Sequence, residues 1–181
     1  MRIDGFICPG HVSAIIGTKP YQFLANRFHI PCVIAGFEPL DLFQSLYILL
    51  NRISAMDAKI DNQYFRAVKE NGNPAALKLI DKVFEKEDSI WRGIGTIPQS
   101  GLRIKDEFEH FDAGKKIQVE IGKTQEPKNC LCGLVIQGKK SPLDCKLFAK
   151  KCTPASPIGP CMVSSEGSCQ AYFKYGQKGR L

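Results

Sequence analysis

The sequence predicts an α/β fold, in which a partial parallel sheet with flanking helices precedes a small, loop-rich, cysteine-rich domain. Three observations support this prediction. Strand-like and helix-like segments alternate over the first 110 residues, six of the eight cysteines fall between Cys130 and Cys169, and five of the eleven prolines lie from Pro127 onward. We therefore expect a sheet domain over residues 1–122 and a cysteine-rich domain over residues 123–181.

The first strand and helix are marked by proline and glycine. Phe6-Ile7-Cys8 is a short apolar run that Pro9-Gly10 ends, as expected of a strand that enters a loop. A helix is predicted over 20–28, because Pro20 in the first turn lacks only an N–H that would have no helical partner. The continuous apolar run over 31–37 predicts a second strand, buried on both faces.

Two further helices follow. Apolar residues at positions 40, 43, 46, 47 and 50 recur at helical spacing, which predicts an amphipathic helix over 40–50. Asn73-Pro74 opens another helix, with Asn73 as the N-cap. Its apolar face would be formed by Leu77, Ile80, Val83 and Phe84.

The loops that follow the two predicted strands are candidate parts of a cleft. In a parallel sheet, ligands bind beside the carboxyl ends of the strands. Cys8 and His11 lie in the first loop region and Glu38 in the second, so these three are the cleft candidates. Simpler roles are a buried thiol for Cys8, a surface residue for His11 and a helix-terminal acid for Glu38. Cys32, inside the apolar run, is expected in the core.

The net charge of +7 comes entirely from the cysteine-rich end. Residues 1–122 hold fifteen basic and fifteen acidic side chains, whereas residues 123–181 hold ten basic and three acidic ones. Nucleic-acid binding is not favoured, because aromatic side chains are not interleaved with the lysines. We expect these lysines to offset the negative charge of clustered thiolates. No Gly-x-Gly-x-x-Gly or phosphate-binding loop is present, so a nucleotide is not indicated.

Composition also predicts the compartment. The N-terminus lacks the apolar segment of a signal peptide, and the most apolar stretch, 40–50, is too short to span a bilayer. We therefore expect a cytoplasmic protein without a membrane segment. In that compartment, clustered cysteines act more often as metal ligands or redox thiols than as structural disulfides.

The cysteine spacing leaves the type of metal site open. Cys130-x-Cys132 is followed by Cys145, Cys152, Cys161 and Cys169. Neither the paired knuckles of a zinc ribbon nor the spacing of bacterial ferredoxins is present. A 4Fe–4S cluster is favoured over zinc only modestly. Four ligands would leave two thiols, enough for a redox pair beside the cluster.

Several segments together resemble the hydrogenase maturation protein family HypD, over essentially the whole chain. They are Phe6-Ile7-Cys8-Pro9-Gly10-His11-Val12-Ser13, Ala35-Gly36-Phe37-Glu38-Pro39, Asn62-Gln63-Tyr64-x-Arg66-x-Val68, Trp91-Arg92-Gly93-x-Gly95 with Ser100-Gly101, Cys130-x-Cys132-Gly133 and Cys152-Thr153-Pro154. The most specific is Pro157-x-Gly159-Pro160-Cys161-Met162-Val163-Ser164-x-Glu166-Gly167-x-Cys169-x-Ala171-Tyr172.

The resemblance implies a role in assembling the Fe(CN)2CO group of NiFe hydrogenases, on a scaffold formed with HypC and supplied with cyanide by HypE. It implies a 4Fe–4S cluster held by Cys130, Cys145, Cys152 and Cys169. Cys132 and Cys161 would then be the redox pair beside it. The chain would act as a maturation scaffold with a redox role rather than as an enzyme that turns over a substrate.

The chain departs from the family in length. Family members are about twice as long and carry an N-terminal half with Cys-Gly-Thr-His and Gly-Pro-Gly-Cys-Pro-x-Cys motifs, neither of which occurs here. We therefore expect a truncated protein, or one that needs a partner chain supplying that half. Two alternatives remain: a cluster-dependent disulfide reductase of the ferredoxin:thioredoxin reductase type, and a zinc-stabilised interaction module.

Overall fold

The structure is a computed structural model that describes residues 3–91, 93–117 and 127–176. The chain divides into two compact units, Arg2–Phe84 and Glu85–Leu181. The domain boundary expected between residues 122 and 123 lies outside the described residues. Each unit is described by itself.

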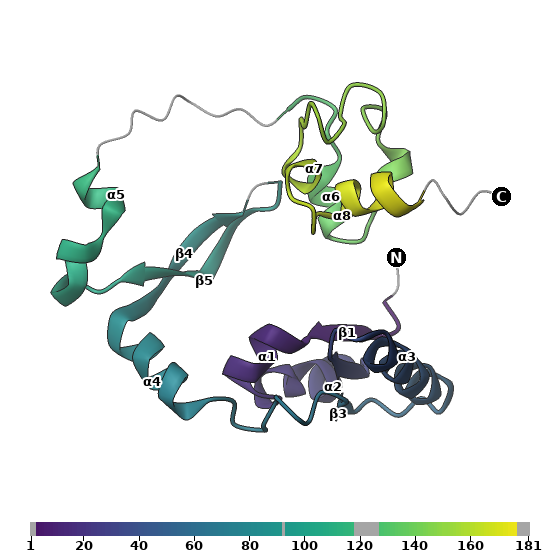
Figure 1. Cartoon of the computed structure of the whole chain (residues 1–181), viewed down its shortest axis with the longest axis vertical. Coiled ribbons are helices and arrows are strands. Elements are labelled where there is room, and N and C mark those ends of the chain that lie inside the picture. The colour runs from purple at the N-terminus through teal and green to yellow at the C-terminus, as the bar shows by residue number, and fades with distance from the viewer. Residues whose placement is uncertain (1–2, 92, 118–126, 177–181) are drawn as a thin grey trace. The chain divides into compact units, whose positions relative to one another are not determined.

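The first unit is built on a three-stranded parallel sheet with the order β1-β2-β3 (Figure 1). Its strands are β1 (Phe6–Pro9), β2 (Cys32–Ala35) and β3 (Ile60–Asn62). The first two confirm the predicted strands. Strand β2 is central and its four residues are all buried, because it has a paired strand on each side and helices against it. The α/β class is therefore confirmed.

Helices connect and flank these strands. They are α1 (Gly10–Ile16), the 3₁₀ turn η1 (Lys19–Tyr21), α2 (Gln22–Phe28), α3 (Pro39–Ser54) and α4 (Pro74–Val83). The helix predicted over 20–28 begins as the 3₁₀ turn that contains Pro20. Asn73 caps α4 as predicted, because its side-chain oxygen accepts hydrogen bonds from the backbone N–H groups of Ala75 and Ala76.

Helix α3 exists where it was predicted, but it is turned the opposite way from an ordinary amphipathic helix. Its buried residues are Asp41, Ser45 and Leu49. The apolar residues whose spacing predicted the helix are exposed instead: Leu40, Phe43, Leu46, Tyr47 and Leu50. A helix on a soluble domain usually turns such a stripe toward the core. We call these five residues the α3 stripe.

The second unit contains a two-stranded sheet and a loop-rich region. Strands β4 (Phe84–Trp91) and β5 (Gly95–Ile104) pair with each other in this sheet. The remaining elements are short: η2 (Asp106–Phe111), α5 (Ala113–Lys116), α6 (Cys132–Ile136), η3 (Pro142–Asp144), α7 (Pro160–Val163), α8 (Ser168–Ala171) and the π-helix η4 (Tyr172–Gly176). Among the helices described in either unit, none has the length and apolar character needed to cross a bilayer.

Candidate functional site

The parallel sheet brings the first turn of α1 and the loop after β2 together at one edge. The loop expected after the first strand is absent, since α1 begins at Gly10 directly after Pro9. The ring of His11, in the first turn of α1, stacks on the ring of Phe37 with centroids 4.0 Å apart. Gly10 permits this approach, since a Cβ atom there would lie 2.5 Å from the backbone oxygen of Ala35. Both rings remain exposed, so this edge offers one polar and one apolar ring to solvent.

A buried carboxylate lies beside this edge, in the first turn of α3. Asp41, in the first turn of α3, is 5% exposed, and both terminal nitrogens of Arg66 donate hydrogen bonds to it. The side-chain amide of Gln63 donates to the same carboxylate across 2.9 Å. The hydrogen bonds from Arg66, and then the one from Gln63, hold the pKa of Asp41 well below its usual range.

Gln63 extends this network to the backbone of the loop. Its side-chain oxygen accepts a hydrogen bond of 3.2 Å from the N–H of Gly36. A Cβ atom on Gly36 would lie 2.1 Å from an oxygen of Asp41, so only glycine fits between the strand and this carboxylate. Loop 36–38, the start of α3 and the segment after β3 are therefore fixed to one another.

The three cleft candidates occupy different environments. His11 lies at the exposed edge. Glu38 is the N-cap residue of α3 and forms a capping box with Asp41, whose carboxylate accepts from the Glu38 N–H. Cys8 is 5% exposed and packs in a core cluster with Cys32, Ile34 and Val68. Its thiol interacts with that of Cys32, and this contact together with burial raises the pKa of Cys8.

Sequence reasoning assigned no role to Asp41, Gln63 or Arg66. Two signals for them were present. Asp41 interrupts an otherwise apolar stretch, and Gln63 and Arg66 belong to a segment that resembles the HypD family. Only the folded chain shows that these residues, 22 and 25 positions apart, meet at one carboxylate.

The six cysteines of the second unit gather in one small core. Cys132, Cys152, Cys161 and Cys169 are buried together with Val135, Phe148 and Met162, and Cys130 and Cys145 pack against this cluster. All eight cysteines of the chain are free thiols. The short helices α6, α7 and α8 supply Cys132, Cys161 and Cys169, and loops supply the other three.

Specific contacts link these thiols. The backbone N–H of Cys161 donates to the sulfur of Cys132 across 3.3 Å, so the backbone of one expected redox residue contacts the thiol of the other. The sulfurs of Cys161 and Cys169 are 2.9 Å apart, which is longer than the roughly 2.05 Å of a disulfide bond. The N–H of Ile158 donates to the sulfur of Cys152. Cys161 thus lies next to Cys132, its expected redox partner, and next to Cys169, an expected cluster ligand.

Glycine makes room for this packing. A Cβ atom on Gly159 would lie 2.6 Å from the sulfur of Cys130 and 3.2 Å from the Cβ of Cys132. A Cβ atom on Gly167 would lie 2.3 Å from the backbone oxygen of Cys161. Both glycines belong to the segment with the most specific resemblance.

Burial sets the protonation of these thiols. It raises the pKa of Cys161 to about 11 and is also the main cause of the raised pKa of Cys130 and of Cys169. The lysines expected to favour the thiolate forms have exposed side chains: Lys128, Lys139, Lys140, Lys146, Lys150, Lys151 and Lys174. In the reduced chain Cys130, Cys161 and Cys169 are therefore mostly protonated at neutral pH, and a metal bound by any of them would have to displace its proton.

Two surface hollows adjoin the cluster. One of about 400 Å³ is lined by Cys130, Cys132 and the β4–β5 turn, and the other, of about 340 Å³, by Cys161, Glu166 and Gly167. The two expected redox thiols each line one hollow, so both sides of the pair face small surface openings.

The donor set suits an iron–sulfur cluster. Six reduced thiols lie in one apolar core, and the sulfur of the expected ligand Cys152 accepts a backbone N–H bond of the kind that tunes clusters. Within residues 3–91, 93–117 and 127–176, no three His, Cys, Asp or Glu side chains are arranged to hold a single metal ion. A four-iron cluster differs from a single ion because each thiolate binds a different iron atom.

Comparison with known proteins identifies the family. The family model described as HypD, Hydrogenase formation hypA family, matches residues 1–176. The hydrogenase maturation factor HypD of Cupriavidus necator is 45% identical over 97% of this chain and 46% of its own length. HypD of Rhodobacter capsulatus is 48% identical over 97% of this chain and 48% of its own length. The chain spans about half the length of the curated relatives it matches, and it belongs to the HypD family.

Proposed function

We propose that this chain acts in the maturation of NiFe hydrogenases, as a redox-active iron–sulfur scaffold for assembly of the Fe(CN)2CO group. Its relatives are named hydrogenase maturation factors, which supports the coarser role. The gathering of six reduced thiols in one core is the observation that supports the more specific role, that of a redox-active iron–sulfur scaffold.

In this proposal Cys130, Cys145, Cys152 and Cys169 hold a 4Fe–4S cluster, and Cys132 and Cys161 form the redox pair. When bound, such a cluster supplies one-electron redox chemistry beside the pair. Oxidation of the pair would join its two sulfurs, release two protons and pass two electrons to an oxidised electron-carrier protein; the reduced form of that carrier would return two electrons and, with two protons, break the bond again. The N–H of Cys161 would stabilise negative charge on the sulfur of Cys132.

The iron under assembly would be the cargo of this scaffold, and other maturation proteins would handle it together with this chain. HypC-like and HypE-like proteins would share the scaffold, together with the part of a family-length HypD polypeptide that has no counterpart in this sequence. The exposed edge with His11, and with Glu38 at the start of α3, is where the cargo would be met. We place this work in the cytoplasm, where thiols stay reduced.

The test begins with anaerobic purification and reconstitution, followed by visible absorption and analysis for iron, sulfide and zinc. A brown protein with about four irons and four sulfides per chain supports the proposal. Stoichiometric zinc with no colour would leave only the zinc-stabilised module.

Cysteine variants then separate ligands from the redox pair. Cys152→Ser should lower the iron content, whereas Cys132→Ser and Cys161→Ser should retain iron and lose the two-electron thiol titration. Iron loss from Cys132→Ser or Cys161→Ser would contradict the assignment of these two cysteines to the redox pair rather than to the cluster ligands. Rapid reduction of a thioredoxin-like protein by the loaded chain would favour the disulfide-reductase alternative.

A further inference from the structure

The α3 stripe is a large apolar surface without a partner among the described residues. Leu40 is 67% exposed, Phe43 and Tyr47 are each 71% exposed, and Leu50 is 61% exposed. These four positions follow each other at intervals of three or four residues, so they lie along one side of α3. A contiguous exposed apolar surface usually marks an interaction site, whereas single exposed apolar side chains are common on any protein surface.

The opposite side of α3 shows that this orientation is specified. Asp41 is held there by Arg66 and Gln63, and Ser45 and Leu49 are buried beside the sheet. Turning the stripe inward would expose this network and break its hydrogen bonds. The stripe therefore cannot be buried by rolling the helix, and only another surface can cover it.

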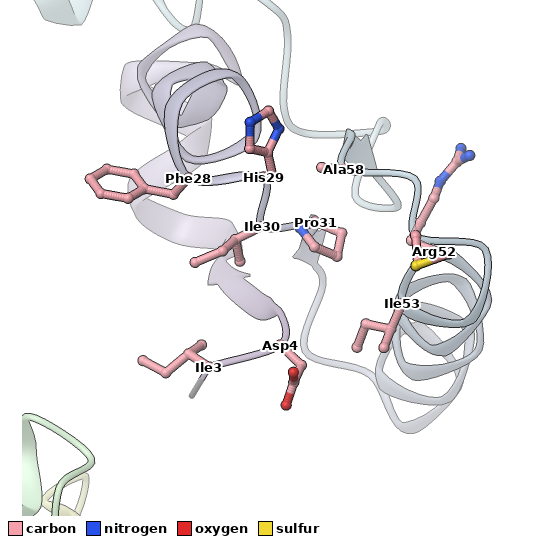
Figure 2. A pocket seen from close by; sticks show the side chains of 10 residues that line it. Ile3, Asp4, Phe28, His29, Ile30, Pro31, Arg52, Ile53 and Ala58 are labelled. Carbon is pink, nitrogen blue, oxygen red and sulfur yellow. The ribbon is translucent and has the colours of Figure 1, made fainter. Parts of the chain in front are cut away.

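A hollow lined by both apolar and polar side chains, the latter being Asp4, His29 and Arg52, adjoins the end of α3. It measures about 470 Å³ and takes Ile53 from the last turn of α3, with Phe28 and Ile30 from the segment before β2 (Figure 2). Met56, which also lines it, is 92% exposed. Ile53 follows Leu50 by one helical turn, so a partner lying along the stripe would reach this hollow.

The length of the relatives indicates the partner. This chain accounts for 46–48% of the length of the HypD proteins from Cupriavidus necator and Rhodobacter capsulatus. A family-length polypeptide therefore carries about as many residues again, and those residues need apolar surface to pack against. We infer that the α3 stripe and its adjoining hollow dock the part of a family-length HypD polypeptide that has no counterpart in this chain. This deepens the partner named in the proposed function and does not depend on the cluster.

The test uses this chain joined, in the relatives' order and through a protease-cleavable linker, to the unmatched part of Rhodobacter capsulatus HypD. After cleavage, size-exclusion chromatography with light scattering measures whether the two pieces stay together at 1:1. We expect a complex whose Kd rises on the order of 100-fold with Phe43→Glu or Tyr47→Glu. Leu79→Glu, at a leucine of α4 that is 62% exposed, is the matched control and should change the Kd by less than about 3-fold.

Hydrogen exchange gives a readout that needs no variant. In the wild-type complex, amide exchange in α3 should be slower than in the free chain, while exchange in α4 stays the same. The inference would be overturned if the wild-type pieces separated after cleavage or if amide exchange in α3 did not change. It would also be overturned if Leu79→Glu weakened binding as much as Phe43→Glu or Tyr47→Glu. A dimer of this chain alone that Phe43→Glu abolishes would assign the surface to a second copy instead. Because no metal is added, failure here leaves the cluster proposal standing.

Discussion

Arg66 holds Asp41 with both terminal nitrogens of its guanidinium group, although 25 positions separate the two residues. This contact ties the start of α3 to the segment after β3. It also keeps a nearly buried carboxylate charged at the edge where His11 and Phe37 stack.

The Asp41 contacts predict a specific dependence of stability on pH. The folded pKa of Asp41 is lowered, so its contribution is fully present above the unfolded pKa of about 3.9 and is lost as the pH falls below it. The difference in urea midpoint between wild type and Asp41→Asn should therefore shrink from about pH 6 to about pH 3. Arg66→Gln should weaken the same dependence. A difference that stays constant with pH would contradict this assignment.

Gly10 predicts a steric cost at the sheet edge. A Cβ atom there would meet the backbone oxygen of Ala35, which cannot move without separating β1 from β2. Gly10→Ala should lower the free energy of unfolding by about 1–3 kcal/mol, as measured by urea denaturation with far-UV circular dichroism. Gly114→Ala in α5, whose nearest neighbour would be the side chain of Asp112 at 3.2 Å, is the control and should change it by less than about 0.5 kcal/mol.

Gly159 predicts an effect on metal retention. Its missing side chain leaves room for the sulfur of Cys130, so Gly159→Ala should displace that expected ligand. We expect reconstituted protein to lose iron to a chelator at about 10- to 100-fold lower chelator concentration. Ala155→Ser, at an exposed loop position, serves as the control. Equal iron retention by both variants would mean that Cys130 is not a ligand.

The raised pKa of Cys161 predicts slow alkylation. With a pKa of about 11, roughly one in a thousand Cys161 thiols is ionised at pH 8, compared with about a quarter of ordinary thiols. In the reduced, metal-free chain, iodoacetamide should modify Cys161 at least about 100-fold more slowly than the cysteine of an unstructured reference peptide in the same solution. Peptide mass spectrometry gives both rates. The Cys161 rate should rise about tenfold per pH unit between pH 8 and 10, and a flat profile would rule out this protonation state.

Local sequence signals predicted the elements but not their orientation. The strand at Phe6 and the N-cap at Asn73 follow from apolar runs and capping chemistry, which act within a few residues. Periodicity identified the side chains on one face of α3 but not the side that faces solvent. Buried contacts of Asp41 from distant residues decide that, and no local pattern encodes them.

Elements with polar composition were missed for a related reason. Strand β3 contains Asp61 and Asn62, and β4 contains four consecutive charged residues over 85–88, so neither has an apolar run. At the thiol cluster, spacing identified the six cysteines but not their contacts. The approach of Cys161 to Cys132 spans 29 positions and depends on Gly159, which the spacing of cysteines does not report.

The short helices of the thiol core have a consequence for the lifetime of the polypeptide. Helices α6, α7 and α8 are four or five residues long, too short to persist in water by themselves, and four of the seven buried residues that join them are cysteines. Oxidation of one such sulfur would remove part of the packing that keeps these segments folded. Cellular proteases would then degrade the damaged molecule, so it would not accumulate in a partly folded form.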